Sequence, residues 1–330
     1  MKVLFDHHSP FFLAHGGFQT QIEQTKAALE QIGIEVEYVR WWDDTQTGDV
    51  IHYFGRPSGG YIHFAHQKGM KVVIAELHSG LGSRGAKARF AQRGLMNACQ
   101  WLLPASFLAK LAWEAYHDAD AFIALTSWEG FLMQNMFHAR KEKIYVVPNG
   151  VEEIFFEKPA GIVTRQDYLV CTATITERKR VLELAEAAVL AKTPVIIAGK
   201  PYSESDPYYL RFLEVVRTHP SVIRFYGAVQ NRTELVQLYR QARGFVLLST
   251  MESLSLSALE AAACGCPLLL TDLPWSRSVF GQEASYCPVA GVKATAVNLR
   301  QFVAEPHAAS FRPLQWKEVG EMLRRIYLQH

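Results

Sequence analysis

The stretch Gly244–Asp272 reads GFVLLSTMESLSLSALEAAACGCPLLLTD and is the most informative part of the sequence. An apolar run, typical of a buried parallel strand, leads into a helical pattern and then into a second apolar run. Glu252 falls in the turn where this helix begins, and Glu260 lies about two turns further along. Three serines crowd the helix start: Ser253, Ser255 and Ser257. Hydroxyls and free backbone N–H groups there can hold phosphate. The spacing alone fits a purely structural interpretation equally well, in which Glu252 only caps the helix and Glu260 is solvated.

Outward from this stretch, short apolar runs alternate with amphipathic ones along the whole chain. The first half predicts six strands, at Lys2–Phe5, Glu35–Tyr38, Val50–Tyr53, Lys71–Leu77, Ala121–Leu125 and Ile144–Val147. Its predicted helices are Gly17–Ile32, Arg89–Leu103, Phe107–His117 and Glu129–Phe137. After Gly150 the pattern restarts with five strands, at Tyr168–Cys171, Pro194–Ala198, Val222–Phe225, Gly244–Leu248 and Pro267–Leu270. Helices between these include Val181–Leu190, Tyr208–Thr218 and Thr233–Ala242. The alternation predicts two α/β halves with parallel sheets.

The two halves define the expected domains. We place their join near residues 152–166, which contain Pro159 and Gly161, so that residues 1–158 and 159–312 form the two domains. The last segment, residues 313–330, is predicted to be a helix over Leu314–Leu328, with four apolar positions on one side: Trp316, Val319, Leu323 and Tyr327.

Composition limits the class of protein. The chain has 330 residues, 49% of them hydrophobic, which excludes a disordered chain. Its 34 basic and 32 acidic residues give a net charge of +2, which argues against a global grip on nucleic acid. The five cysteines fit no zinc spacing and suggest a reduced, cytoplasmic location. No window of 18 uncharged apolar residues occurs, and the N-terminus resembles a first strand rather than a signal peptide.

Four further segments follow predicted strands and are candidates for ligand contact. They are His15-Gly16-Gly17, His78, Pro148-Asn149-Gly150 and the basic run Thr176–Arg180. Paired glycines allow close approach to a ligand, a strand-end histidine can take part in proton transfer, and clustered bases suit a diphosphate. Each also has a plain structural interpretation: a glycine loop, a buried histidine, a turn and a solvated charge cluster.

Taken together, these five elements resemble the retaining glycosyltransferases of family 4. These enzymes have the α/β GT-B fold, in which two Rossmann-like domains face each other across a cleft. The resemblance runs along nearly the whole chain. Its most specific parts are Glu252 and Glu260, which have seven residues between them and are followed by AAACGCPLLLTD, and the PNGV turn with Phe155 after it.

The resemblance implies an N-terminal half that binds the acceptor and a C-terminal half that binds a nucleotide-diphosphate sugar. Three residues receive catalytic roles: His78 and Glu252 would contact the transferred sugar, and Lys179 would neutralise the leaving diphosphate. No metal and no cofactor are implied. The helix at residues 313–330 would cross back onto the N-terminal domain.

The remaining implied residues bind the donor. Gly16 and Gly17 would lie near its phosphates, and the backbone N–H groups of Ser255 and Leu256 would contact them. Glu260 would hold the ribose hydroxyls.

The sequence departs from the family pattern at the diphosphate site. The arginine usually found five or six residues before the lysine is Ala173 or Thr174 here, and the glycine after the lysine is Arg180. Arg178 or Arg180 could substitute for it, although a helical neighbour is not expected to point the same way as Lys179.

Two other motifs are weaker. Gly80–Gly85 fits the pattern GxGxxG, but no acidic residue follows at the spacing that a dinucleotide site needs. Asp118-Ala-Asp120 fits the metal-binding DxD of other glycosyltransferases, but is expected at a helix end.

The window Leu77–Trp113 contains no acidic residue. It carries five bases, Arg84, Lys87, Arg89, Arg93 and Lys110, together with four large aromatics, Phe90, Trp101, Phe107 and Trp113. This composition fits a core helix pair with a solvated basic face, which we favour slightly. It also fits contact with an anionic membrane or a lipid-linked acceptor.

The sequence therefore predicts a retaining, metal-independent glycosyltransferase of hexosyl type. It would act on a hydroxyl acceptor in surface polysaccharide or glycolipid assembly, in the cytoplasm or at the inner face of the membrane. A non-catalytic nucleotide-sugar-binding or partner protein remains the alternative, and an NAD-linked oxidoreductase is the third.

Overall fold

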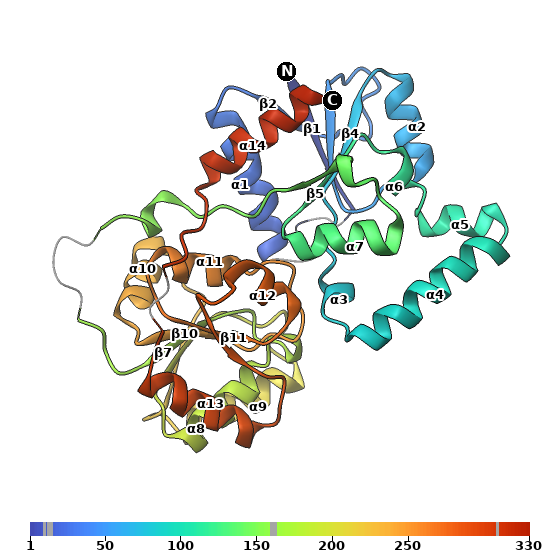
Figure 1. The fold of residues 1–330 in the computed structure, drawn as a ribbon. Helices are drawn as coiled ribbons and strands as arrows, with labels where there is room; N and C mark the ends of the chain where they lie inside the picture. The colour runs from blue at the N-terminus through green and yellow to red at the C-terminus, as the bar shows by residue number, and fades with distance from the viewer. Residues whose placement is uncertain (9–10, 12–15, 159–163, 308–309) are drawn as a thin grey trace. The chain divides into compact units, whose positions relative to one another are not determined.

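The computed structural model describes residues 1–8, 11, 16–158, 164–307 and 310–330. The chain divides into two compact units (Figure 1). Unit 1 comprises Met1–Asn149 with Trp316–His330, and unit 2 comprises Gly150–Gln315. The division falls at the Asn149-Gly150 turn, nine residues before the boundary expected at residue 158, and His15, Pro159 and Gly161 lie outside the described residues.

Unit 1 contains a six-stranded parallel sheet in the order β2-β1-β3-β4-β5-β6. Its strands are β1 Lys2–His7, β2 Glu35–Tyr38, β3 Val50–Phe54, β4 Lys71–Ile74, β5 Ala121–Ala124 and β6 Ile144–Val146. Its helices are α1 Gly17–Gln31, α2 Gly59–Gln67, α3 Ser79–Gly82, α4 Ala86–Leu102, α5 Ala105–Leu111, α6 Ala115–Asp118, α7 Ser127–Phe137 and α14 Trp316–Gln329, with a 3-10 turn η1 at Lys141–Lys143.

Unit 2 repeats the architecture with the sheet order β12-β11-β10-β7-β8-β9, again all parallel. Its strands are β7 Leu169–Thr172, β8 Val195–Ala198, β9 Ile223–Gly227, β10 Gly244–Leu247, β11 Leu268–Thr271 and β12 Ser285–Cys287. Its helices are α8 Val181–Ala191, α9 Pro207–Thr218, α10 Arg232–Gln241, α11 Leu256–Ala263, α12 Pro274–Phe280 and α13 Val292–Ala304, with 3-10 turns η2 Glu153–Phe155 and η3 Glu177–Lys179.

Buried apolar side chains explain why these strands form sheets covered by helices. The central strands of both sheets are almost continuously buried, as in parallel sheets that carry helices on both faces. The strand order reverses between β1 and β3 in unit 1, and between β7 and β10 in unit 2. Ligands of such sheets bind beyond the carboxyl ends of the strands at these reversals.

The C-terminal helix α14 belongs to unit 1 and packs on α1 (Figure 1). The four apolar positions expected on one side of it are all buried. A Cβ atom at Gly320 would lie 2.9 Å from the carbonyl oxygen of Ala28 on α1, so the two helices approach closely there. The Tyr327 hydroxyl reaches Nδ1 of the buried His52 on β3, at 2.5 Å.

Most expected elements occur within one to three residues of their predicted ends, and the differences have local causes. The helix predicted at Phe107–His117 is wrong, because Ala112 has a left-handed φ of 50° that separates α5 from α6. The described part of unit 2 has six strands rather than the five expected, since the sequence analysis did not predict the edge strand β12.

Candidate functional site

The residues singled out in unit 2 meet at the reversal of its sheet. Lys179 lies in η3, which follows β7, and Glu252 lies in the loop between β10 and α11. The Lys179 ammonium and the Glu252 carboxylate form an ion pair in which both side chains are nearly buried. Because β7 and β10 are neighbouring parallel strands, their carboxyl ends bring these two loops together.

Arg178 joins the same cluster. Its guanidinium lies 3.5 Å from Oε1 of Glu252, the oxygen that Lys179 also contacts, and donates to the Met251 carbonyl at 2.6 Å. The Arg178 carbonyl in turn accepts from the backbone N–H of Thr250 at 2.9 Å. The expectation that Arg178 would not point the same way as Lys179 is therefore wrong. The turn is a 3-10 helix, and both side chains reach one carboxylate.

One of the two departures from the family pattern, the arginine at position 180, has a visible local consequence. Arg180 has a φ of 54°, a left-handed conformation that favours glycine, and its buried side chain donates to the Ala290 carbonyl. The Nη1 atom of Arg180 is buried and has no hydrogen-bond partner among the described residues.

Three buried hydroxyl oxygens near the cluster find no hydrogen-bond partner among the described residues. They belong to Thr176, which precedes η3, and to Ser249 and Ser253 in the loop between β10 and α11. Leaving a buried hydroxyl unpaired costs free energy, so such groups are expected where a ligand or water completes the site. Their position on the same two loops as Lys179 and Glu252 indicates a polar ligand.

The start of α11 supplies further donors. Ser255 is its N-cap, and the Ser255 hydroxyl accepts from the backbone N–H of Ala258 at 3.3 Å and contacts the Ser257 hydroxyl at 3.1 Å. Leu256 is the first helical residue. The N–H groups of a first helical turn have no preceding carbonyl in the helix, which makes this end suited to an anion.

Glu260, further along α11, is not solvated. Its carboxylate accepts from the Tyr239 hydroxyl at 3.1 Å and lies 3.3 Å from the Arg232 guanidinium. The Tyr239 hydroxyl also contacts Oγ1 of Thr172 at 2.6 Å. Burial raises the pKa of Glu260 to about 7, although Arg232 and Tyr239 act to lower it. The sequence analysis did not identify Tyr239, Thr172 or Arg232, since a single polar residue on a helix or strand has no distinctive pattern.

In unit 1, His78 lies just after β4 and is buried. The Tyr116 hydroxyl lies 3.0 Å from His78 Nε2 and donates to Glu76 at 2.5 Å, and Glu76 is paired with Arg56 at 2.8 Å. The His78 backbone N–H donates to the buried Glu129 at 2.9 Å. Burial lowers the pKa of His78, so its imidazole is neutral near pH 7.

Gly16 and Gly17 open α1. Gly16 is the N-cap with a φ of 136°, a conformation that side chains rarely adopt, and its carbonyl accepts from the Thr20 backbone at 3.2 Å. Gly17 is exposed as the first helical residue. The next residue, Phe18, lines a cavity of about 570 Å³ together with Arg56 and Glu76. Unit 1 therefore brings its predicted loops near the His78 network.

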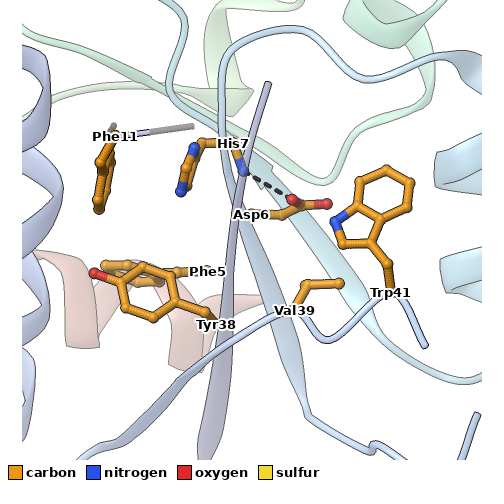
Figure 2. A pocket seen from close by; sticks show the side chains of 7 residues that line it. All are labelled: Phe5, Asp6, His7, Phe11, Tyr38, Val39 and Trp41. Atoms are coloured by element: carbon orange, nitrogen blue, oxygen red, sulfur yellow. Dashed lines mark hydrogen bonds between the residues drawn. The ribbon is translucent and has the colours of Figure 1, made fainter. Parts of the chain in front are cut away.

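A second cavity of unit 1, of about 240 Å³, lies at the carboxyl ends of β1 and β2. Figure 2 shows its aromatic lining, with His7 stacked on Phe11 and Trp41 across from them. It is lined by Phe5, Asp6, His7, Phe11, Tyr38, Val39 and Trp41. The buried Asp6 accepts from the His7 backbone at 2.8 Å and from the Tyr61 hydroxyl at 2.7 Å. The sequence analysis did not anticipate this cavity.

The two weaker motifs, GxGxxG and DxD, have structural explanations. Gly82 of the GxGxxG pattern packs against Trp128, whose indole N–H donates to the Gly82 carbonyl at 3.1 Å. In the DxD pattern, Asp118 ends α6, and Asp120 accepts from the Val72 backbone at 2.8 Å and pairs with His66 at 2.8 Å.

Comparisons with known proteins find similarity to glycosyltransferases. The model of the family "Glycosyl transferases group 1" matches residues 152–311. A UDP-N-acetylglucosamine–peptide N-acetylglucosaminyltransferase GtfA subunit of Streptococcus pneumoniae is 24% identical over 187 residues, 52% of this chain and 36% of the relative. A D-inositol 3-phosphate glycosyltransferase of Actinosynnema mirum is 27% identical over 242 residues, 64% of this chain and 58% of the relative. The matches thus span less than two thirds of either relative.

Solved structures support the fold. The crystal structure of Anabaena HepE in complex with UDP and glucose superposes with a TM-score of 0.64 at 13% identity, and the match covers 100% of both chains. Together with the two six-stranded parallel sheets, this likeness confirms the expected GT-B fold class. The family-model match lies within unit 2 and covers just under half of the chain, and the two relatives are likewise glycosyltransferases of low identity to it.

Proposed function

We propose that the chain is a retaining glycosyltransferase of hexosyl type, which moves a sugar from a nucleotide-diphosphate sugar to a hydroxyl acceptor without a metal ion. The observation that carries the proposal is the cluster in unit 2. There Lys179 and Arg178 converge on Glu252, beside three buried hydroxyls without partners among the described residues. This combination of charge and unsatisfied polar atoms suits a diphosphate joined to a sugar.

The chemical step expels a nucleoside diphosphate. The bond between the anomeric carbon and the diphosphate oxygen breaks while the acceptor oxygen bonds to the same carbon, and the leaving phosphate takes the acceptor's proton. Negative charge grows on the leaving oxygen, and Lys179, Arg178 and the N–H groups of Ser255 and Leu256 stabilise it. Preorganised groups of this kind commonly supply the largest share of catalysis.

In the structure, Lys179 and Arg178 both pair with the Glu252 carboxylate. A bound diphosphate carries more negative charge than Glu252 and competes for Lys179 and Arg178. Once displaced, the Glu252 carboxylate can accept hydrogen bonds from hydroxyls of the transferred sugar. The ion pair therefore compensates the buried charges of Lys179 and Glu252 until the donor binds.

Glu260 would hold the nucleotide. Its carboxylate lies on the same helix whose start would bind the phosphates, and Arg232 and Tyr239 fix its position. Two adjacent ribose hydroxyls can donate to the two oxygens of one carboxylate. The solved HepE complex contains UDP and glucose, which makes UDP-linked sugars the first donors to test.

The acceptor would bind unit 1. The aromatic cavity that includes Tyr38 and Trp41 offers flat apolar faces beside the Asp6 carboxylate, a combination that suits a sugar-bearing acceptor. A role in polysaccharide or glycolipid assembly, a cytoplasmic location and the roles of His78, Gly16 and Gly17 toward the donor stay predictions. No helix among the described residues has the length and apolar character needed to cross a membrane.

A ligand screen followed by a transfer assay tests the proposal. Nucleotide sugars and nucleoside diphosphates are added to the protein, and its melting temperature is measured. A ligand at 100 times its Kd adds about 2.7 kcal/mol of stability, which is readily detected. Transfer to a panel of hydroxyl acceptors is then measured for the wild type and for Glu252→Ala, with Lys293→Ala on α13 as a surface control.

The expected result is stabilisation by one nucleotide sugar, transfer by the wild type, and loss of most transfer in Glu252→Ala with unchanged folding. Near-full activity in Glu252→Ala refutes its assigned role. A donor that binds without ever being turned over favours the non-catalytic alternative. If no nucleotide sugar or nucleoside diphosphate stabilises the protein, the proposed donor site in unit 2 is refuted.

A further inference from the structure

Helix α4 of unit 1 has an unusual exposure pattern. Four large apolar side chains on it are exposed: Phe90 by 82%, Leu95 by 64%, Trp101 by 92% and Leu102 by 79%. At 100° per residue these four fall within a sector of about 140° on one side of the helix. Met96, the one residue of α4 classed as buried among those described, lies outside that sector. The helix therefore turns its apolar face outward.

The opposite side of α4 attaches it to unit 1. There the Arg89 guanidinium stacks over the Trp128 ring on α7 at 4.6 Å. Asn97, at the edge of the apolar sector, contacts His138 through its amide oxygen at 3.3 Å. Beyond α4, the chain continues into α5, where Phe107 is 57% exposed. We call residues 84–111 the arm. In Figure 1, α4 and α5 extend away from the strands of their own unit.

The arm is strongly basic. It carries all five bases of the acid-free window, Arg84, Lys87, Arg89, Arg93 and Lys110. None of them forms an ion pair with an acidic side chain in the part of the chain that the structure describes. Lys87 lies within the apolar sector of α4, close to Phe90 and Trp101 by helical angle. The expectation of a core helix pair is therefore wrong, because the arm's aromatic side chains face outward.

We propose that the arm is a membrane-docking element that binds an anionic lipid surface. A helix with exposed aromatic and leucine side chains and a basic flank lies in the interface of a bilayer, with its apolar side toward the acyl chains and its charges among the headgroups. Trp is favoured at that depth. The charge of the arm selects anionic lipid, since each Lys or Arg near such a surface strengthens partitioning roughly five-fold.

Charge also decides between a bilayer and a second copy of the chain. Two arms packed face to face would bring five unpaired bases of each chain against five of the other, with no acidic residue in either arm. Like charges placed together across an interface oppose association. An anionic bilayer instead satisfies both the apolar face and the bases.

Co-sedimentation of the full chain with lipid vesicles tests the proposal. The vesicles are phosphatidylcholine alone, or phosphatidylcholine with a third phosphatidylglycerol. We expect binding to the anionic vesicles at 50 mM NaCl that weakens at 500 mM NaCl, and much weaker binding to the neutral ones. Phe90→Ser/Trp101→Ser should lower the partition coefficient at least ten-fold. Lys87→Gln/Arg93→Gln should lower it roughly 25-fold, at five-fold per charge.

Matched controls separate the arm from the rest of the surface. Leu210→Ser/Val297→Ser removes two exposed apolar side chains of unit 2, and Lys293→Gln/Lys317→Gln removes two exposed charges outside the arm. Both controls should bind like the wild type. Because every substituted side chain is exposed, the melting temperatures should also match.

Four outcomes would overturn the proposal. The wild type could fail to bind anionic vesicles at low salt, or bind neutral vesicles equally well. The arm variants could bind as tightly as the wild type. Light scattering could reveal a dimer that the arm substitutions dissociate, without vesicle binding, which would identify a second copy as the occupant. None of these readouts depends on glycosyl transfer. The membrane-docking proposal can therefore be refuted while the proposed glycosyltransferase function stands.

Discussion

The two strand-end sites differ in how well their polar groups are satisfied. In unit 1, the His78 ring lies at the end of a connected series, Arg56 to Glu76 to Tyr116, whose distances are 2.8, 2.5 and 3.0 Å. In unit 2, Lys179 and Glu252 compensate each other, but three neighbouring buried hydroxyls lack partners among the described residues. A satisfied network holds a side chain in one position, whereas unsatisfied groups gain free energy when a ligand arrives.

Lys179→Ala should have the largest effect, because it removes the most buried cation of the unit 2 cluster. Loss of one such charge-stabilising group typically costs a hundred-fold or more in turnover. We expect kcat/KM for transfer to fall at least a hundred-fold and nucleoside diphosphate affinity to fall with it. Calorimetry with the diphosphate and steady-state kinetics measure the two quantities, and Lys293→Ala is the matched lysine control.

The comparison with Glu252 variants sharpens this prediction. Glu252 competes with the diphosphate for Lys179, so Glu252→Ala should leave diphosphate affinity unchanged or improved while transfer is lost. Equal loss of diphosphate affinity in the Lys179 and Glu252 variants would contradict the competition and indicate that the ion pair only holds the two loops together.

Tyr116→Phe should have a smaller effect and tests the unit 1 network. It removes the hydroxyl between His78 and Glu76 but keeps the ring, which stacks on Phe137 at 4.4 Å between centroids. Leaving a buried partner unsatisfied costs about 1–3 kcal/mol, so the melting temperature should drop by several degrees. If the hydroxyl positions His78 for transfer, kcat falls while KM for the donor changes little. The same drop in melting temperature with an unchanged kcat would assign the Tyr116 hydroxyl a structural role alone.

Sequence patterns predicted which loops form the candidate site, but not all of the side-chain contacts within it. Lys179 and Glu252 follow neighbouring parallel strands, so their meeting could be expected from topology. The approach of Arg178 to the same oxygen could not, because it depends on a 3-10 turn rather than an α-helix. Tyr116 and Tyr239 are distant in sequence from their partners and fit no motif. Periodicity predicted two-sided helices in the arm, but it cannot tell which side another element covers.

The pH dependence of nucleotide binding should show the smallest effect and concerns Glu260, whose pKa is raised to about 7 by burial. Below pH 7 the carboxyl is protonated, and it accepts ribose hydrogen bonds less strongly than the ionised form. The Kd for a nucleoside diphosphate should therefore decrease as pH rises from 6 to 8.5, by at most about ten-fold if only the ionised form binds. The folded protein also holds a proton that the unfolded chain has lost between pH 4.5 and 7, so the stability of the free protein should fall as pH rises through this window. Glu260→Gln removes the group and should flatten both slopes, while the titration of the ligand's own phosphate stays in both proteins and cancels in the comparison. Parallel slopes for wild type and variant would show that Glu260 does not contact the ribose.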